Sequence, residues 1–235
     1  MVIKEWKHVF KLDPERAISD EALERLCLSG TDAIMVGGST GITYDNTVDI
    51  LSRVRRYEVP CVQEISAIEA VVPGFDLYFI PAVLNTDDAR WMTGMHHTAL
   101  RRYGSFMEWD KLIPEGYVIL NDECTAAQLT GSSAPADAKD LTAYALMVDR
   151  LYRMPVFYVE YSGVFGNMEW VAQAKSALQH TRLFYGGGIR TAEQAKAAAA
   201  AADTIVVGNI IYENLEQALT TIQTKPFPNV AAQFV

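Results

Sequence analysis

The sequence contains little cysteine and histidine. Its three cysteines, Cys27, Cys61 and Cys124, are far apart and match no metal-binding spacing, which argues against a cysteine-ligated metal centre. We expect reduced, buried thiols in a cytoplasmic protein. The four histidines fall on predicted helices or inside a predicted strand, so we expect no catalytic role for them.

Long apolar runs and an excess of positive charge are also absent. No stretch approaches the length needed to span a bilayer, and residues 1–10 contain no apolar core of a signal peptide. Any membrane contact is therefore expected to be peripheral. The formal net charge of −9 argues against nucleic acid as a partner. It leaves an anionic substrate open, because helix N-termini and a few lysines can create a local positive site.

What the sequence does contain is a regular alternation of strand-like and helix-like segments. Half of the 235 residues are hydrophobic, which is enough for a large core. Eight apolar strand candidates alternate with helical patterns, which predicts an α/β fold, a (β/α)8 TIM barrel. Since composition is uniform, residues 1–235 are expected to form one domain. The predicted strands cover residues 6–11, 32–36, 61–65, 77–80, 117–121, 156–159, 183–185 and 204–207.

One strand-to-strand connection is too short for a helix. Only eleven residues, 66–76, separate the third and fourth strands, whereas a parallel crossover usually needs a dozen or more. The third helix of the barrel is therefore predicted to be missing or reduced to a turn. The small-residue segment 126–135 is predicted to be an exposed loop, and the last helix is placed at residues 214–224, before a mobile tail.

Two glycine-marked strand ends near the C-terminus predict a phosphate site. Gly186-Gly187-Gly188 follows one strand and Gly208-Asn209 follows the next, and each precedes a predicted helix. Glycine backbone and helix N-termini bind phosphate, and the loops after strands seven and eight commonly do so in such barrels. The alternative is that the three glycines only make a tight turn.

Polar residues at the other strand ends indicate catalysis. Lys11 ends the first strand and Asp13 follows it, and they could hold a phosphate and a Mg²⁺, respectively. Glu160, flanked by Tyr158 and Tyr161, is a candidate general base or a ligand for a substrate hydroxyl. A solvated charge pair and a structural ion pair in the barrel mouth are the alternatives.

Several motifs together resemble the geranylgeranylglyceryl phosphate synthase family, and most of all its bacterial PcrB branch, the heptaprenylglyceryl phosphate synthases. They are EWKHVFKLDP, GGSTGIT, EISAIEAVVPGFDLYFIP, YVEYSG, YGGGIR and IVVGN, which span nearly the whole chain. The resemblance implies Mg²⁺-dependent transfer of a long prenyl chain, in the PcrB branch heptaprenyl, from its diphosphate to the 3-hydroxyl of sn-glycerol 1-phosphate. It also implies a barrel with a replaced third helix, as the short connection predicts.

By position, the resemblance assigns most of the candidate residues to one of the two substrates. The metal and diphosphate would lie at Asp13 and Ser39, and Glu160 would be the catalytic residue. Glycerol 1-phosphate would contact Lys11, Tyr158, Glu160, Tyr161, Ser162, Gly163, Gly188, Gly208 and Asn209.

A prenyl channel is expected beside the short connection. We place it along Val72, Tyr78, Met92, Met95 and Ala99, with the last three sharing one helix face. In the family, the position of Ala99 resembles a ruler that is aromatic in archaeal-type enzymes and small in the bacterial branch. The methionines could instead be ordinary core residues.

We further expect a cytoplasmic homodimer, with any membrane contact at the membrane surface. Two other functions stay open on the sequence. A phosphosugar isomerase or lyase would need no apolar groove, and a non-catalytic polyprenyl-phosphate binding protein would need no organised glycerol phosphate site.

Overall fold

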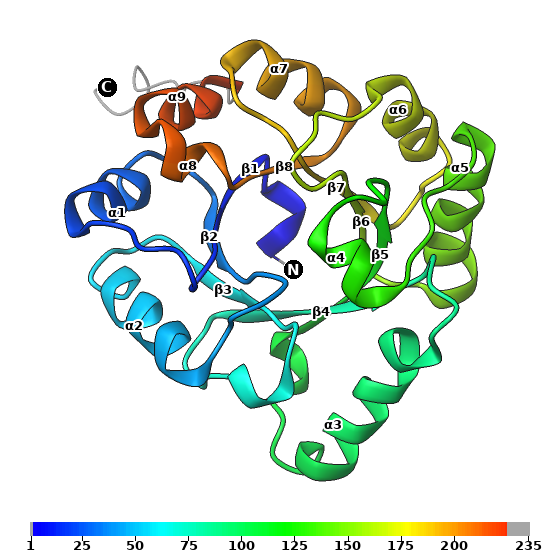
Figure 1. The fold of residues 1–235 in the computed structure, drawn as a ribbon, viewed down its shortest axis with the longest axis horizontal. Coiled ribbons are helices and arrows are strands. Elements are labelled where there is room, and N and C mark those ends of the chain that lie inside the picture. The colour runs from blue at the N-terminus through cyan, green and yellow to red at the C-terminus, as the bar shows by residue number, and fades with distance from the viewer. Residues whose placement is uncertain (1, 225–235) are drawn as a thin grey trace, which may run out of the picture.

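The computed structural model describes residues 2–224, in which eight parallel strands close into a barrel in chain order (Figure 1). The predicted (β/α)8 barrel is confirmed. The tail predicted after the last helix, residues 225–235, lies outside the described residues. The strands are β1 His8–Leu12, β2 Ala33–Val36, β3 Cys61–Glu64, β4 Leu77–Val83, β5 Leu112–Ile119, β6 Val156–Glu160, β7 Arg182–Gly186 and β8 Thr204–Val207.

Helices surround this barrel, and their N-termini carry the expected caps. The Ser19, Thr43 and Thr191 side chains each accept a backbone N–H of the helix that follows, which satisfies donors that the helix itself leaves unpaired. The helices are α1 Asp20–Cys27, α2 Tyr44–Val54, α3 Met95–Tyr103, α4 Thr125–Thr130, α5 Ala138–Leu146, α6 Met168–Ser176, α7 Ala192–Ala201, α8 Ile210–Glu213 and α9 Leu215–Thr220. Two of them have π-helical neighbours, Arg90–Gly94 before α3 and Met147–Tyr152 after α5.

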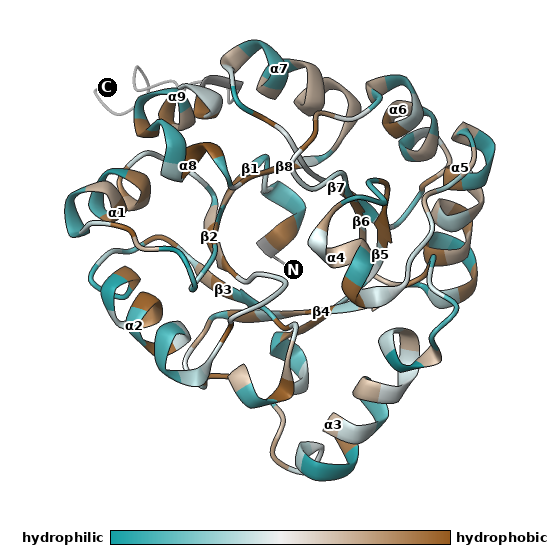
Figure 2. Cartoon of the chain, viewed as in Figure 1, coloured by the Kyte–Doolittle hydropathy of each residue, from teal (hydrophilic) through white to brown (hydrophobic). Residues whose placement is uncertain are grey.

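The apolar residues form two concentric layers. One fills the barrel interior and includes Val9, Val62, Phe79 and Phe184. The other lies between the strands and the helices, so the strands are hydrophobic on both faces (Figure 2). Because successive side chains alternate between these layers, the register decides which polar residues reach the interior.

The third helix is reduced to a turn, as predicted. Between β3 and β4 the chain forms only the 3-10 turn Ile68–Ala70. The Gln63 side chain holds this segment, because its amide donates to Ala70 O at 2.7 Å and accepts from Val72 N at 3.2 Å. The next helix, α3, lies at the edge of the molecule, well away from the barrel axis (Figure 1).

Two expectations about the middle of the chain were wrong. Residues 126–135 are not a loop throughout, since α4 occupies Thr125–Thr130 and buries Ala127, and only 131–135 lie outside a helix. Strand β5 begins at Leu112 rather than at residue 117. Pro114 and Gly116 interrupt the apolar pattern of this strand, because both residue types are unusual in strands. Gly116 is required, since a Cβ there would lie 2.3 Å from Val148.

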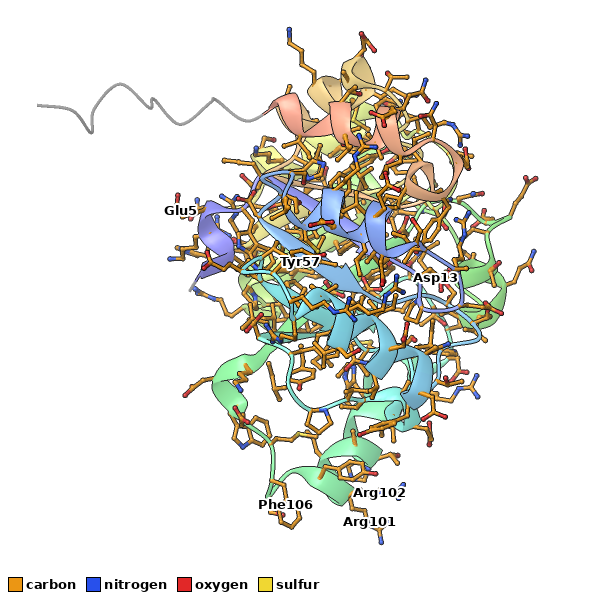
Figure 3. The ribbon with its side chains drawn as sticks, turned by 90° about the vertical axis from the view of Figure 1, so that its left-hand side faces the viewer. Glu5, Asp13, Tyr57, Arg101, Arg102 and Phe106 are labelled. Atoms are coloured by element: carbon orange, nitrogen blue, oxygen red, sulfur yellow. The ribbon has the colours of Figure 1, made fainter. Side chains whose placement is uncertain are left out.

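The two ends of the barrel differ. At the amino ends of the strands, the 3-10 helix Val2–Glu5 brings buried Ile3 and Trp6 into the interior apolar layer. Asp13, after β1, lies on the opposite side of the molecule from Glu5 (Figure 3). Within residues 2–224, no helix is long and apolar enough to cross a membrane.

Candidate active site

A cavity of about 1250 Å³ opens at the carboxyl ends of the strands, where barrels of this kind carry their active sites. One end of it is polar and the other is apolar. The polar end is lined by Lys11, Asp13, Ser39, Glu64, Tyr117, Tyr158, Glu160, Ser162, Gly163, Gly188, Gly208 and Asn209. All predicted metal and glycerol phosphate residues except Tyr161 therefore meet in one cavity.

Glu160, the last residue of β6, is buried at the centre of this polar end. Its Oε1 accepts the Ser162 backbone N–H at 2.6 Å, and its Oε2 accepts the Tyr117 hydroxyl at 2.9 Å. Burial raises the pKa of Glu160, and the Lys11 ammonium and these two donors oppose the rise. The carboxylate is thus fixed in orientation and more basic than an exposed glutamate.

The turn after β6 is strained so that its backbone can serve the site. Ser162 has φ 21°, which is unusual for a residue other than glycine, and Gly163 follows at φ 84°. Besides the bond to Glu160, the Asn121 amide donates to Ser162 O at 2.8 Å. Asn121, two residues after β5, therefore holds the turn.

Lys11 is the charged partner of a second buried carboxylate. Its ammonium lies 2.5 Å from Glu64 Oε2 and 5.6 Å from the centre of the Tyr158 ring. Burial alone would lower the pKa of Lys11, but Glu64 and Glu160 outweigh it and raise the pKa. A Cβ at Gly37 would come within 3.0 Å of the Glu64 Cβ, so the chain after β2 packs directly on this carboxylate.

Tyr158 forms the floor of the polar end. Its ring stacks on Tyr117 with centroids 4.7 Å apart, and its hydroxyl has no hydrogen-bond partner among residues 2–224. A Cβ on Gly186 would lie 2.4 Å from that hydroxyl. The first glycine of the triplet is therefore required to make room for the tyrosine.

The other glycines form a backbone cradle. Gly187 and Gly188 have φ 128° and 60°, and a Cβ on Gly188 would lie 2.1 Å from Phe165 N. Thr191 caps α7 directly after them, and Gly208-Asn209 precede α8. Both segments line the same end of the cavity, as an anion site requires.

Asp13 and Ser39 both line the cavity, and the residue before Ser39 packs on Asp13. The Asp13 backbone N–H donates to the Tyr212 hydroxyl at 2.8 Å, and a Cβ on Gly38 would lie 2.9 Å from Asp13 Oδ1. No cluster of three or more His, Cys, Asp or Glu in the described chain could hold a metal alone. One carboxylate beside a bare glycine backbone nevertheless fits Mg²⁺, which often takes one or two carboxylates together with substrate phosphate oxygens.

The apolar end of the cavity extends from the short β3–β4 connection to α3. Tyr78, Met95 and Ala99 line it, as predicted for the channel, and so does Trp91.

Two predicted channel residues do not line it. Val72 points into the outer core instead. Met92 is off the cavity face because it lies in the π-helical segment, whose wider turn changes the angular spacing and puts Trp91 in line with Met95.

Tyr161 corrects a further prediction. The inward positions on β6 are Tyr158 and Glu160, so Tyr161 points outward. Its ring packs on Tyr185, with centroids 6.0 Å apart, in the layer beneath the helices. It supports the glycine turn, because a Cβ on Gly187 would lie 2.6 Å from the Tyr161 Cβ.

The residues that contact the site residues could not be identified from the sequence. Glu64, Tyr117 and Asn121 were given no role. Arg16 also went unnoticed, although its guanidinium lies 3.9 Å from the centre of the Tyr212 ring and donates to Asn209 Oδ1 at 3.3 Å. Only the alternation of inward and outward side chains along a strand could have indicated that Tyr117 faces the cavity. The predicted strand began at Tyr117, so the residues before it were not available to show this alternation.

The chain is similar to known proteins along nearly its whole length. Residues 1–225 match the model of the PcrB family. Over 220 residues the chain is 54% identical to the heptaprenylglyceryl phosphate synthase of Geobacillus kaustophilus, covering 94% of this chain and 92% of that protein. The enzyme of the same name from Lysinibacillus sphaericus is 53% identical over 219 residues, 93% of this chain and 96% of that protein.

A solved structure extends the similarity to the archaeal enzymes. The geranylgeranylglyceryl phosphate synthase of Thermoplasma acidophilum, in complex with its substrate sn-glycerol-1-phosphate, superposes with a TM-score of 0.82 at 25% identity. The match covers 95% of this chain and 96% of that one.

Proposed function

The chain belongs to the PcrB family, and we propose that it is a prenyltransferase that joins a long polyprenyl chain, heptaprenyl, to the 3-hydroxyl of sn-glycerol 1-phosphate. The products are an ether-linked prenylglyceryl phosphate and diphosphate. The observation that carries the proposal is the two-ended cavity, in which an anion cradle and a buried carboxylate continue into an apolar arm. A phosphosugar isomerase or lyase would have no use for that arm.

The glycine cradle binds the phosphate of the acceptor. Backbone N–H groups of Gly188 and Gly208-Asn209 and the Lys11 ammonium surround this end of the cavity. Glu160 orients the acceptor hydroxyl and takes its proton as the oxygen bonds to C1 of the prenyl chain. The bond from C1 to the diphosphate oxygen breaks in the same step.

We propose Mg²⁺ as the cofactor, held by Asp13 and Ser39 together with the diphosphate. When bound, the ion would neutralise charge on the leaving diphosphate. The apolar arm, lined by Tyr78, Met95 and Ala99, holds the prenyl chain and aligns C1 with the acceptor hydroxyl. Fixing two substrates in this way can contribute about 7–11 kcal/mol in the best cases.

The direct test is incubation with radiolabelled glycerol 1-phosphate, Mg²⁺ and a ladder of polyprenyl diphosphates, followed by organic extraction. We expect label in the organic phase, most of it with the seven-unit chain. Label that stays in the aqueous phase with every prenyl donor would contradict the transferase.

Membrane contact is proposed at the tip of α3. Phe106, just after α3, and Trp109, in the 3-10 helix before β5, are 84% and 58% exposed, and both line the cavity. Arg101 and Arg102 project beside Phe106 at the tip of α3 (Figure 3). Exposed aromatic rings and arginines suit an anionic lipid surface, from which a polyprenyl chain could enter the arm.

Sedimentation with phosphatidylcholine vesicles, with and without phosphatidylglycerol, tests this contact. Each arginine is worth about 1 kcal/mol near an anionic surface, so Arg101→Gln with Arg102→Gln should weaken binding roughly thirtyfold. Leu151→Ser, at another exposed apolar residue, is the control. Equal binding by all three proteins would exclude the α3 tip.

The homodimer also stays a prediction, which light scattering on the purified protein checks.

A further inference from the structure

A third buried acid, besides Glu160 and Glu64, lies inside the barrel. Glu115 is on β5 between Ile113 and Tyr117, which both belong to the interior layer, so its side chain also points inward. It is fully buried, and it is not among the residues that line the cavity. The proposed reaction gives it no part.

The strand register places Glu115 next to Glu64. Lys11 on β1 is in register with Met35 on β2, and Met35 is in register with Val62 on β3. Glu64 lies two residues beyond Val62. Glu64 pairs through Phe79 with Ile113, and Glu115 is likewise two residues beyond. Inward residues on alternate strands of a barrel share a layer. Lys11 and Glu64 are related in this way and lie 2.5 Å apart, and Glu115 is related to Glu64 in the same way.

The buried oxygens of the two acids lack partners. Glu64 Oε1 and both carboxyl oxygens of Glu115 have no hydrogen-bond donor among residues 2–224. Two ionised carboxylates would face one lysine here, with a third carboxylate, Glu160, close by. Buried like charges disfavour simultaneous ionisation, and a single proton between the acids would satisfy two of these oxygens.

We propose that Glu64 and Glu115 share one proton, as a carboxylic acid donating to a carboxylate, and that Glu115 thereby acts as a positioning residue for the Glu64–Lys11 pair. The ionisable groups that face the pair are Lys11 from β1, Tyr117 from β5, and Tyr158 and Glu160 from β6. The other strands contribute Met35, Phe79, Phe184 and Val206 to this part of the interior. Burial, and then the charge of Glu64, raise the pKa of Glu115 well above its usual range, which supports the assignment.

The shared proton matters for the anion that Lys11 is proposed to bind. With one proton on the pair, the two acids carry one negative charge, and Lys11 balances it. Without the proton, the polar end would gain a further negative charge below an incoming phosphate. This consequence rests on the proposed function, whereas the shared proton itself does not.

Infrared spectroscopy tests the proton directly. The wild-type protein at neutral pH should show the C=O stretch of a protonated carboxylic acid, and Glu115→Gln should remove it. The exposed Glu58→Gln is the matched control and should keep the band. A wild-type spectrum without the band overturns the proposal, even if the Glu115 variant fails to fold.

Calorimetric binding of sn-glycerol 1-phosphate tests the positioning. The amide of Glu115→Gln can still donate to Glu64, so affinity should persist. Glu115→Leu cannot donate, and we expect roughly tenfold weaker binding, the lower value for one hydrogen bond to a charged group. In a Lys11→Met background, that difference should vanish.

The outcomes separate the two proposals. Equal affinities for the Gln and Leu variants would overturn the positioning role. Wild-type protein that shows the infrared band but binds no glycerol phosphate would instead count against the proposed function.

Discussion

At the scale of single residues, Glu160 is the most informative side chain. Glu160→Gln should keep the fold, because the two side chains are nearly isosteric and the amide can still accept from Ser162. Losing a general base typically costs about 10²–10⁴-fold in turnover. Turnover within a few-fold of wild type, measured with the labelled acceptor, would remove Glu160 from the mechanism.

The pH profile gives Glu160 a second signature. Burial is the main cause that raises its pKa, and Lys11 opposes the rise. Since the ionised form is the base, kcat/KM should fall as pH drops through this raised pKa. The acid limb should therefore lie at higher pH than for an exposed glutamate, and it should be absent from the residual activity of Glu160→Gln.

Asp13→Asn tests the proposed metal site. An amide oxygen is a poorer ligand than a carboxylate for a hard cation, so half-maximal activity should require more Mg²⁺. Affinity for glycerol 1-phosphate should change less, because the cradle proposed for it lies at Gly188 and Gly208. A Mg²⁺ titration that matches wild type would contradict the assignment.

The placement of the candidate residues in the cavity was predictable where it depended on strand ends. Lys11, Glu160 and Gly188 could be found because each directly follows or ends an apolar strand, and such ends converge in a barrel. Tyr161 was predicted to face the cavity, but its side chain faces the outer core. Successive residues of a strand point to opposite faces, so an error of one residue moves a side chain from one to the other. The partners Glu64 and Tyr117 lie 53 and 43 residues from Lys11 and Glu160 and could not be paired without the register.

At the scale of elements, continuous apolar strands such as β8 were predicted with their observed bounds. The start of β5 was missed because Pro114 and Gly116 are unusual in strands, yet Gly116 is needed for packing against Val148. Helix α4 was missed because it has only six residues, TAAQLT, and the turn-forming residues Gly131-Ser132-Ser133 follow it directly. The absence of the third helix was predictable, because the connection between β3 and β4 is too short to contain one.

Ala99→Trp tests the α3 face of the channel. The indole would occupy the apolar arm, so long prenyl donors should lose more turnover than short ones. Each buried methylene contributes about 0.8 kcal/mol, which makes the penalty grow with the length excluded. The measurement is relative turnover over the prenyl ladder. Met92→Trp is the control, since Met92 does not line the cavity. An unchanged length preference in Ala99→Trp would place the channel elsewhere.

At the scale of the whole molecule, Asp149 connects two parts of the barrel. It follows α5, is fully buried, and accepts three backbone N–H groups, from Gln179, His180 and Thr181, that lead into β7. Burial alone would raise its pKa, but these bonds lower it to about 2. A depressed carboxyl pKa stabilises the fold above the unfolded value and stops doing so as pH falls through the folded value.

Asp149→Asn should therefore lower the free energy of unfolding at neutral pH by about 2 kcal/mol. The difference should shrink as pH falls from about 4 toward 2. Urea denaturation across this range is the measurement, with the exposed Asp87→Asn as control. A difference that stays constant with pH would mean that Asp149 acts through packing alone.

The absent third helix has a consequence for the heat resistance of the protein. In an ordinary barrel that helix would cover apolar strand and turn residues permanently, whereas here the cover would be a substrate tail that comes and goes. Ligands that bind only the folded state add stability, about 2.7 kcal/mol at a hundredfold excess over Kd. Melting temperature should thus rise with each isoprene unit of a non-reactive prenyl diphosphate until the arm is full, so that a thermal scan measures the length of the channel.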